Sequence, residues 1–341
     1  MTGVASLRAQ LLELLFAEGV PKLWCPPLTH YDAEGAIDRV RGAAHLAFIA
    51  RWSLGWFVPG STGDAWELSP EESREVVDLA LTEAGRRHAH VLVGALHRDA
   101  DVAARLLSEG RELLYAHEAA AAICGFALCP PRGEDLSQEE LDEALSHLLA
   151  LGVPVALYQL PQVTLNEMSP QLVQDLALRF SNFVLFKDTS GADRVASAGA
   201  DLGGLFLVRG AEGDYARHLQ LNGGHYDGLL LSSANSFGAQ LQAIAELSTE
   251  GRRQEAEALS ERLSSLVAAV FRVVEGLPDG NAFTNAAKAV DHFFAHGPAA
   301  RTAPAPCLHS GGRLPKPVLE ATEDLLRRYG LLPSQGYLEG R

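Results

Sequence analysis

The chain has 341 residues, of which 47% are hydrophobic, and its formal net charge is −15 at pH 7. This length and apolar content are enough to bury one large core with a modest appendage. The acidic balance argues against a general nucleic-acid or anionic-membrane surface, because phosphate contacts need clustered Lys and Arg.

The amino end, residues 1–20, is amphipathic and carries acidic residues, so we expect a helix rather than a signal peptide. Residues 21–250 then alternate short apolar runs, typical of buried strands, with longer helical patterns. We expect the strands to end near Pro26, Val58, Gly94, Cys129, Tyr158, Lys187, Arg209 and Ser232. The helices are expected around 36–51, 70–86, 99–119, 137–150, 169–179, 190–201, 212–221 and 236–248.

Two of these helices have clear start signals, since Ser69-Pro70 and Ser169-Pro170 each place a capping hydroxyl before a proline at the first helical position. Eight strand–helix repeats favour an α/β fold of the (β/α)8 TIM-barrel class over an open doubly wound sheet. The open sheet stays as the alternative, because strand order is invisible in a sequence.

The region 251–341 changes character and predicts a C-terminal helical subdomain. Helical patterns without strands cover 252–275, about 280–295 and about 316–330. A segment rich in Pro, Gly and Ala, 297–306, separates the last two. We expect this subdomain to pack against the barrel and to contribute to an interface between copies of the chain.

Several classes of site have no support in the sequence. Four cysteines form no CxxC or zinc-like spacing, and their presence as isolated thiols is typical of a cytoplasmic protein. Twelve histidines show no HExxH or comparable spacing, so we predict no metal site. No apolar stretch approaches the ~20 residues of a membrane helix, and we expect no membrane partner.

Lys187 is the main candidate for chemistry. It ends the apolar stretch 182–186 and precedes the turn-forming residues 188–191, which places it at the carboxyl end of a buried strand. An amine with a pKa near ~10.4 is protonated in neutral water, but desolvation lowers that pKa and frees the lone pair. Such a lysine can form a Schiff base. The alternative is a lysine that extends its amine into solvent.

Two neighbouring features converge on Lys187 if the barrel is correct. Tyr158 ends the preceding strand, and adjacent strands lie ~4.8 Å apart, so the phenol and the amine can meet over one substrate carbon. The turn Gly60-Ser61-Thr62-Gly63-Asp64 follows the second strand. Its N–H groups and hydroxyls can hold a carboxylate, although Ser61 and Thr62 can equally stabilise a tight turn.

Other residues at the expected barrel mouth have open assignments. Arg132 is a candidate for binding a distal carboxylate or phosphate of a substrate, or is simply an exposed loop residue. Gly210, with Glu212 and Asp214, can line the pocket and contact substrate hydroxyls, or can begin a helix. Asn235 is a candidate ligand contact or a capping residue.

Three segments together resemble the signatures of the dihydrodipicolinate synthase / N-acetylneuraminate lyase family. They are residues 59–64 (PGSTGD), 158–161 (YQLP) and 186–191 (FKDTSG). Weaker agreement runs from 32–35 through the helix start at 68–72, to Gly228, to 234–235, and on into the helical tail. The resemblance covers nearly the whole chain in the family's order and spacing.

The resemblance implies a (β/α)8 barrel with a helical carboxyl subdomain, assembled as a homo-oligomer (a dimer or tetramer). It also implies a class I aldolase mechanism with no cofactor beyond a covalent imine on Lys187, formed with pyruvate or another 2-oxo acid. Tyr158 would move protons, and Thr62 would act with it in the catalytic set. Ser61 and Gly60, with Thr62, would bind the carboxylate of the 2-oxo acid.

The chain departs from the family's synthases at informative positions. Synthases acting on aspartate semialdehyde carry an arginine where this chain has Val163, which cannot pair with a carboxylate. A relay tyrosine after the fourth strand is replaced by the segment 129–133 (CPPRG), and Gln159 and Asp64 replace the common Asn and Glu. Thr189 resembles the lyase-type pattern and joins the substrate-binding set.

We therefore expect a lyase that cleaves or forms a C–C bond between pyruvate and an aldehyde, acting on a sugar-derived 2-oxo acid. The first alternative is a dehydratase of a 2-keto-3-deoxy sugar acid that uses the same imine. The remaining alternatives are a dihydrodipicolinate synthase-like enzyme and a barrel that binds a 2-oxo acid without turnover.

Overall fold

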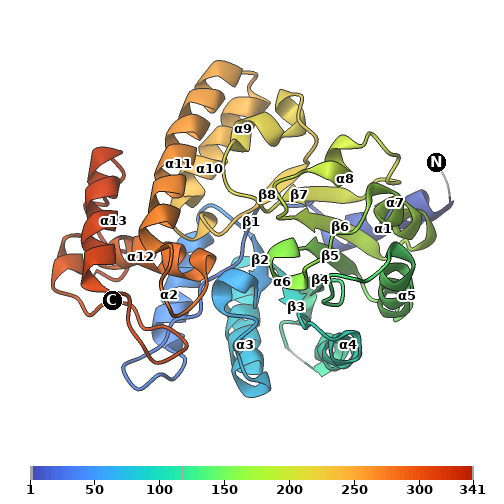
Figure 1. Ribbon diagram of the computed structural model, residues 1–341, viewed down its shortest axis with the longest axis horizontal. Helices are drawn as coiled ribbons and strands as arrows, with labels where there is room; N and C mark the ends of the chain where they lie inside the picture. Colours follow the sequence, from blue (N-terminus) through green and yellow to red (C-terminus); the bar gives the residue numbers. More distant parts are fainter. Residues whose placement is uncertain (1–2, 117, 340–341) are drawn as a thin grey trace.

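The protein is described by a computed structural model covering residues 3–116 and 118–339 (Figure 1). Its central feature is a closed barrel of parallel strands in the order β1 to β8, with β1 pairing to β8. The strands are β1 (Leu23–Cys25), β2 (Gly55–Val58), β3 (His90–Gly94), β4 (Ile123–Leu128), β5 (Val155–Gln159), β6 (Phe183–Asp188), β7 (Phe206–Arg209) and β8 (Gly228–Leu230). The predicted barrel is thereby confirmed, and the open-sheet alternative is excluded.

Helices surround the strands and extend beyond them at the carboxyl end of the chain (Figure 1). The α-helices are α1 (Gly3–Leu15), α2 (Arg39–Ile49), α3 (Pro70–Arg87), α4 (Ala100–Ala116), α5 (Gln138–Leu149), α6 (Pro161–Thr164), α7 (Pro170–Arg179), α8 (Arg194–Ser197), α9 (Tyr215–His218), α10 (Ala234–Thr249), α11 (Arg253–Val274), α12 (Ala282–His296) and α13 (Lys316–Arg328). Four short 3₁₀ turns are η1 (Ser61–Gly63), η2 (Ala120–Ala122), η3 (Gln220–Asn222) and η4 (Gly297–Arg301). No helix in the described ranges is both long and apolar enough to span a membrane.

Local capping chemistry fixes where the regular helices begin. The Ser69 hydroxyl accepts from the Glu72 amide, and the Glu72 carboxylate accepts from the Ser69 amide, which completes a capping box at the start of α3. The Ser169 hydroxyl caps α7 through the Leu172 amide. Both predicted starts are confirmed, because these bonds satisfy amides that would otherwise lack a partner in the first turn.

Two predicted helices are much shorter than the sequence pattern indicates. The helix expected over 190–201 is only α8 (Arg194–Ser197), and the one expected over 212–221 is α9 (Tyr215–His218) followed by η3. Asp193 and Asp214 precede them with left-handed φ angles of 53° and 50°, which a continuing helix does not allow. Asp193 is held there because its carboxylate binds the Arg209 guanidinium and the Tyr226 hydroxyl.

The amino end of the barrel is closed by α1, which contacts β6 and α7. Arg8 of α1 is fully buried and donates to main-chain carbonyls of Phe183, Leu202 and Phe180, among others. A buried guanidinium is tolerated because its N–H groups all meet acceptors. The site must therefore lie at the opposite end of the barrel, where the strands terminate.

The C-terminal helices share the barrel's outer core rather than forming a separate one. One apolar cluster runs from barrel strands and α2 through Leu266 of α11 and Phe293 of α12 to Leu326 of α13. A second apolar cluster fills the barrel interior with Trp24, Phe57, Leu92 and Leu185. In addition, α12 contacts η1, so the carboxyl region reaches the end of the barrel where the strands terminate.

Candidate active site

Lys187 lies next to the end of β6 and is buried, with 5% of its surface exposed. Its Nζ stands 3.9 Å from the centre of the Tyr158 ring and 5.0 Å from that of Phe57. Within the described residues, no carboxylate forms an ion pair with it. Burial lowers the pKa of Lys187 to about 7, although the Cys129 thiol and the Glu212 carboxylate oppose this shift. A substantial share of this amine is therefore uncharged at neutral pH.

Tyr158 is the direct strand partner of Lys187, since the two Cα atoms are paired in the β5–β6 register. The phenol is buried and packs edge-on to Phe57, with ring centres 5.8 Å apart. Burial raises the pKa of Tyr158, and the Cys129 thiol adds to the effect, while hydrogen bonding with the Ser61 and Thr189 side chains opposes it. The phenol thus keeps its proton at neutral pH and can lend it to a nearby substrate atom.

The turn between β2 and α3 forms the third side of the site. Ser61, Thr62 and Gly63 make up η1, and all three are buried. The Trp66 indole donates to the Ser61 hydroxyl at 2.9 Å, which orients that oxygen. Gly60 is tightly surrounded, because a Cβ there would stand 3.0 Å from Pro26 and 3.2 Å from Phe57. The side chain of Ser61 also interacts with the Tyr158 phenol, so the predicted turn lies beside that residue.

Thr189 and Gly210 stand beside Lys187 on the β6–β7 side. A Cβ on Gly210 would lie 2.2 Å from Thr189 Oγ1 and 2.8 Å from Lys187 Cε, so only glycine leaves the lysine its space. Thr189 Oγ1 is buried and, apart from a contact with the Tyr158 phenol that falls short of hydrogen-bond geometry, has no partner among the described residues. An unsatisfied buried hydroxyl next to the amine is a candidate contact for a substrate oxygen.

Glu212, in the loop after β7, is held by four donors. The Ser232 hydroxyl and the Ser233 amide donate to one of its carboxylate oxygens, and the Tyr215 and Ser233 hydroxyls donate to the other. The carboxylate is close enough to Lys187 to oppose the fall in that lysine's pKa. The β6–β8 side of the mouth is consequently polar.

The β3–β5 side of the mouth is apolar. Leu96, Cys129 and Leu160 belong to the same buried cluster as Tyr158, and Val163 and Trp66 pack against it. Burial raises the pKa of the Cys129 thiol, which keeps it neutral. The side chain of Val163 thus adds apolar surface where a cation would be needed to pair with a carboxylate.

Two residues predicted to bind substrate lie in other surroundings. Asn235 is fully buried, and its amide nitrogen donates to the Pro26 and Ser232 carbonyls. Its amide oxygen accepts from the Leu28 amide and faces His45 Nε2, so all its polar atoms are used in joining α10 to the segment after β1. Arg132 is an exposed loop residue whose amide donates to the Arg98 carbonyl.

A comparison with known protein families shows to which family this chain belongs. Residues 21–278 match the model of the "Dihydrodipicolinate synthetase family".

The chain belongs to the dihydrodipicolinate synthetase family.

Its curated relatives include synthases at modest identity. The 4-hydroxy-tetrahydrodipicolinate synthase of Hyphomonas neptunium is 30% identical over 250 residues, which is 72% of this chain and 82% of the relative. Among solved structures, the E. coli K12 prophage protein YagE, determined with pyruvate, aligns with a TM-score of 0.72 and 21% identity, covering 91% of this chain and 99% of that one. A variant of Sulfolobus solfataricus 2-keto-3-deoxygluconate aldolase aligns with a TM-score of 0.70 and 17% identity, covering 91% and 96%. At these identities the solved structures establish the fold.

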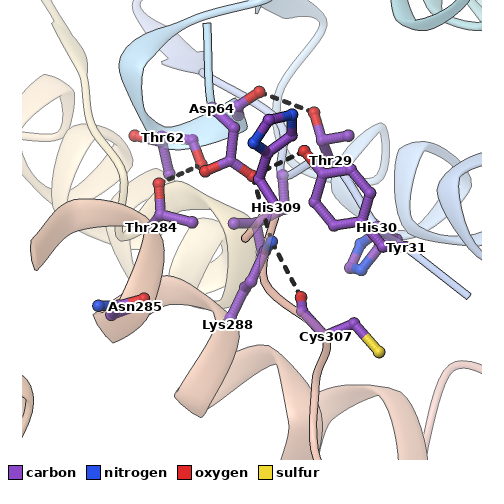
Figure 2. Close-up of polar contacts among 12 residues, drawn as sticks. Thr29, His30, Tyr31, Thr62, Asp64, Thr284, Asn285, Lys288, Cys307 and His309 are labelled. Carbon is purple, nitrogen blue, oxygen red and sulfur yellow. Dashed lines mark hydrogen bonds and ion pairs between the residues drawn. The ribbon is translucent and has the colours of Figure 1, made fainter. Parts of the chain in front are cut away.

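Sequence reasoning missed the residues that anchor the Ser61–Thr62 turn. Figure 2 shows Lys288 of α12 beside Asp64, the residue that follows η1, and the two groups are 3.2 Å apart. The Tyr31 hydroxyl donates to the same carboxylate oxygen at 3.0 Å. Thr284 and Asn281 donate to carbonyls of the turn itself. Family signatures give no indication of these contacts, because Lys288 lies in a helix 224 residues after Asp64 and no local pattern links the two.

A second buried polar group involves His30, His45 and Asp291, whose ligand atoms lie within 4.8 Å of one another. Hydrogen bonds account for the proximity of His45 and Asp291, whereas His30 Nε2 lies 4.0 Å from the carboxylate and has no hydrogen-bond partner among the described residues. His45 Nδ1 and the Tyr337 hydroxyl approach one Asp291 oxygen at 3.0 and 2.9 Å, and Arg41 donates to the other at 3.1 Å. Burial alone would raise the pKa of Asp291, but the His45, His30 and Arg41 charges hold it well below its ordinary value. These donors already balance the carboxylate charge, so the group is explained as part of the packing between α2 and α12.

Proposed function

We propose that this protein is a class I lyase that forms an imine between Lys187 and pyruvate and makes or breaks a C–C bond to an aldehyde, acting on a sugar-derived 2-oxo acid. The observation that carries the proposal is the buried Lys187 amine, which has no carboxylate partner among the described residues and lies against Tyr158. Membership of the family supports the same chemistry, since its enzymes are lyases of the aldolase type.

Imine formation needs a neutral amine. The lone pair of Lys187 Nζ attacks the C2 carbonyl of pyruvate, proton transfers convert the carbonyl oxygen to water, and the water leaves. Tyr158 is the group in place to move those protons, because its phenol lies next to the amine and keeps its proton at neutral pH. The hydroxyls of Ser61 and Thr62 would hold the carboxylate of pyruvate.

The protonated imine then serves as an electron sink. In the cleavage direction, the C4 hydroxyl loses a proton, the C3–C4 bond breaks, and its electrons form the enamine on pyruvate while an aldehyde departs. In the condensation direction the enamine carbon attacks the aldehyde and the same proton returns. The buried Thr189 hydroxyl and the polar loop around Glu212 support an aldehyde that carries hydroxyl groups.

The apolar side of the barrel mouth argues against an aldehyde substrate that carries a carboxylate of its own. Leu96 and Leu160 belong to the same buried apolar cluster as Tyr158, and Val163 packs against that cluster. A buried carboxylate without a cation or donors would be strongly disfavoured. Aspartate semialdehyde is therefore a poor candidate for the second substrate, and a synthase-like function ranks below the lyase.

Borohydride trapping tests the proposal directly. Incubation with pyruvate and borohydride, followed by peptide mass spectrometry, should place the reduced adduct on Lys187. An adduct elsewhere, or none, would remove the imine mechanism. A barrel that binds a 2-oxo acid without turnover would give the adduct but no product with any aldehyde.

The dehydratase is the second candidate, because it would begin from the same imine. There a base removes a C3 proton and the C4 hydroxyl leaves as water, so no pyruvate is produced. Incubating the protein with 2-keto-3-deoxy sugar acids and measuring pyruvate release against formation of a dehydrated 2-oxo acid separates the two. Assembly as a dimer or tetramer also stays a prediction, which sedimentation of the purified protein would test.

A further inference from the structure

The turn that carries Ser61 and Thr62 is held from behind by the carboxyl-terminal helix α12. Thr284 Oγ1 donates to the Thr62 carbonyl at 3.0 Å and lies 3.3 Å from the Ser61 carbonyl. Asn281 Nδ2 donates to the Ser61 carbonyl at 3.1 Å. Both donors come from the first turn of α12 or its cap, and Figure 2 shows Thr284 pointing at Thr62.

These bonds determine which way the peptide groups of the turn face. In a trans peptide, the carbonyl of one residue and the N–H of the next point in opposite directions. Anchoring the Ser61 carbonyl on α12 therefore turns the Thr62 amide away from α12. The Ser61 side chain meanwhile interacts with Tyr158, so the turn lies between α12 and the catalytic phenol.

The last residues of the turn are also held by hydrogen bonds and an ion pair. Thr29 Oγ1 donates to the Gly63 carbonyl at 2.7 Å, so three consecutive carbonyls of the turn are bound by side chains. Asp64 follows, and its buried carboxylate pairs with Lys288 Nζ, which also donates to the Cys307 carbonyl at 3.2 Å. Figure 2 shows this group gathered behind the turn. Farther along, α12 packs against the protein through Val290 and Phe293 and through the hydrogen bonds of Asp291.

We infer that Thr284 and Asn281 of α12 are positioning residues for the carboxylate of the 2-oxo acid, because they set the orientation of the Ser61–Thr62 turn that would bind it. This inference rests on the proposed function and goes beyond it, since neither residue faces the reacting atoms. Pyruvate affinity and the packing of the carboxyl region are then coupled: loosening α12 weakens binding of the acid, and binding of the acid stabilises α12.

The test uses the whole protein and compares Thr284→Val with Thr284→Ser. Valine keeps the shape of the threonine but cannot donate to the carbonyls, whereas serine keeps the hydroxyl. The readout is the pyruvate concentration that gives half-maximal borohydride trapping on Lys187. For Thr284→Val we expect it to rise by about two- to tenfold, the equivalent of one hydrogen bond, while the maximal yield of adduct stays at the wild-type level. For Thr284→Ser we expect the wild-type value.

A matched control removes a buried threonine hydroxyl from α13, at a position that does not contact the turn. Thr322 of α13 is fully buried, and its hydroxyl donates to the Val318 carbonyl of its own helix at 2.8 Å. Thr322→Val should lower stability without changing half-saturation. Methyl pyruvate supplies a second control, because it keeps the ketone and lacks the charged carboxylate, so its trapping should be equal in the wild type and in Thr284→Val.

The inference is wrong if Thr284→Val saturates with pyruvate as the wild type does, or if Thr322→Val shifts half-saturation to the same extent. It is also wrong if Thr284→Val weakens trapping of methyl pyruvate as much as that of pyruvate, since the effect would not concern the carboxylate. A wild-type protein that gives no Lys187 adduct would instead overturn the proposed function on which the inference rests.

Discussion

Two lysines of this protein are buried at the same end of the barrel, and they differ in their charged partners. Lys187 and Lys288 are 5% and 2% exposed, and each amine lies over a tyrosine ring, at 3.9 Å from Tyr158 and 4.5 Å from Tyr31. Lys288 also has the Asp64 carboxylate at 3.2 Å. Within the described residues, Lys187 has no such partner.

This difference shows which surroundings make a buried lysine nucleophilic. Burial lowers the pKa of both amines, because a low-dielectric surrounding disfavours the charged form. At Lys288 the charge and hydrogen bond of Asp64 oppose that effect, so the pair serves to hold the turn in place. At Lys187 burial takes the pKa to about 7, and the amine becomes available for chemistry.

The largest expected effect is on catalysis. Lys187→Ala should abolish turnover and borohydride trapping, because the substituted side chain has no amine to form the imine. A chain that keeps near-normal activity after this change would refute the imine route. Lys288 lies behind the turn rather than in contact with the reacting atoms, so the trapped adduct should never map to it.

Stability should respond to the two lysines in opposite directions. Lys288→Met leaves the buried Asp64 charge unpaired, which we expect to cost about 3–5 kcal/mol of unfolding free energy. Lys187→Met removes a desolvated amine and should stabilise by about 0.5–2 kcal/mol. Thermal and urea unfolding at pH 7 give both values, and an Asp64→Asn/Lys288→Met double variant should recover part of the loss. Equal losses from the two single changes would show that the comparison is wrong.

Tyr158→Phe tests the role of the phenol hydroxyl that lies beside Lys187. Removing the hydroxyl while keeping the ring should slow turnover by about two orders of magnitude or more, the usual size of a lost general acid–base group. Steady-state kinetics with the identified substrate measure this effect. Wild-type turnover in Tyr158→Phe would exclude proton transfer by this phenol.

The pH dependence follows from the lowered pKa of Lys187. Only the neutral amine attacks, so the initial rate of adduct formation should rise with pH through about 7, rather than near the ~10.4 of a free lysine. The stability effect has a defined sign as well. At pH values between the folded pKa of about 7 and the ~10.4 of a free lysine, the unfolded chain binds more protons than the folded chain. The free energy of unfolding therefore rises with pH over this range. The gain from Lys187→Met should accordingly shrink as the pH is raised.

The smallest expected effect concerns Val163. Val163→Arg should not by itself confer synthase activity, because the chain also lacks the relay tyrosine after β4 that the family's synthases carry. Coupled assays with pyruvate and aspartate semialdehyde would measure this. Appreciable turnover would show that a single cation at this position is enough to change the substrate.

The barrel and the reacting pair were accessible to sequence reasoning because strand ends are marked locally. The run 182–186 followed by Lys187 and turn formers sets the end of β6, and parallel pairing then brings Tyr158 alongside. The roles of Lys187 and Tyr158 were inferred from the resemblance to the family. The lengths of α8 and α9 were not accessible, since the left-handed Asp193 and Asp214 are held by tertiary hydrogen bonds that no local pattern encodes.

Long-range polar contacts account for the rest of what the sequence could not predict. Asp64 stands in a predicted turn with nothing nearby in the sequence to indicate its ion pair. Asn281 caps α12, because its side chain accepts from the Thr284 amide. Only the folded structure shows that its other amide atom reaches Ser61. Asn235 was a candidate for a ligand contact or a capping role, and its side-chain amide is hydrogen-bonded within the packed structure.

The order in which the ribosome makes this chain gives the α12 contacts a further meaning. Ser61 and Thr62 are synthesised early, whereas Asn281 and Thr284, which hold their carbonyls, emerge more than two hundred residues later. All eight strands are complete before α12 exists. Under the proposed function, the contacts that orient the turn toward the 2-oxo acid can therefore form only after all eight strands have been synthesised.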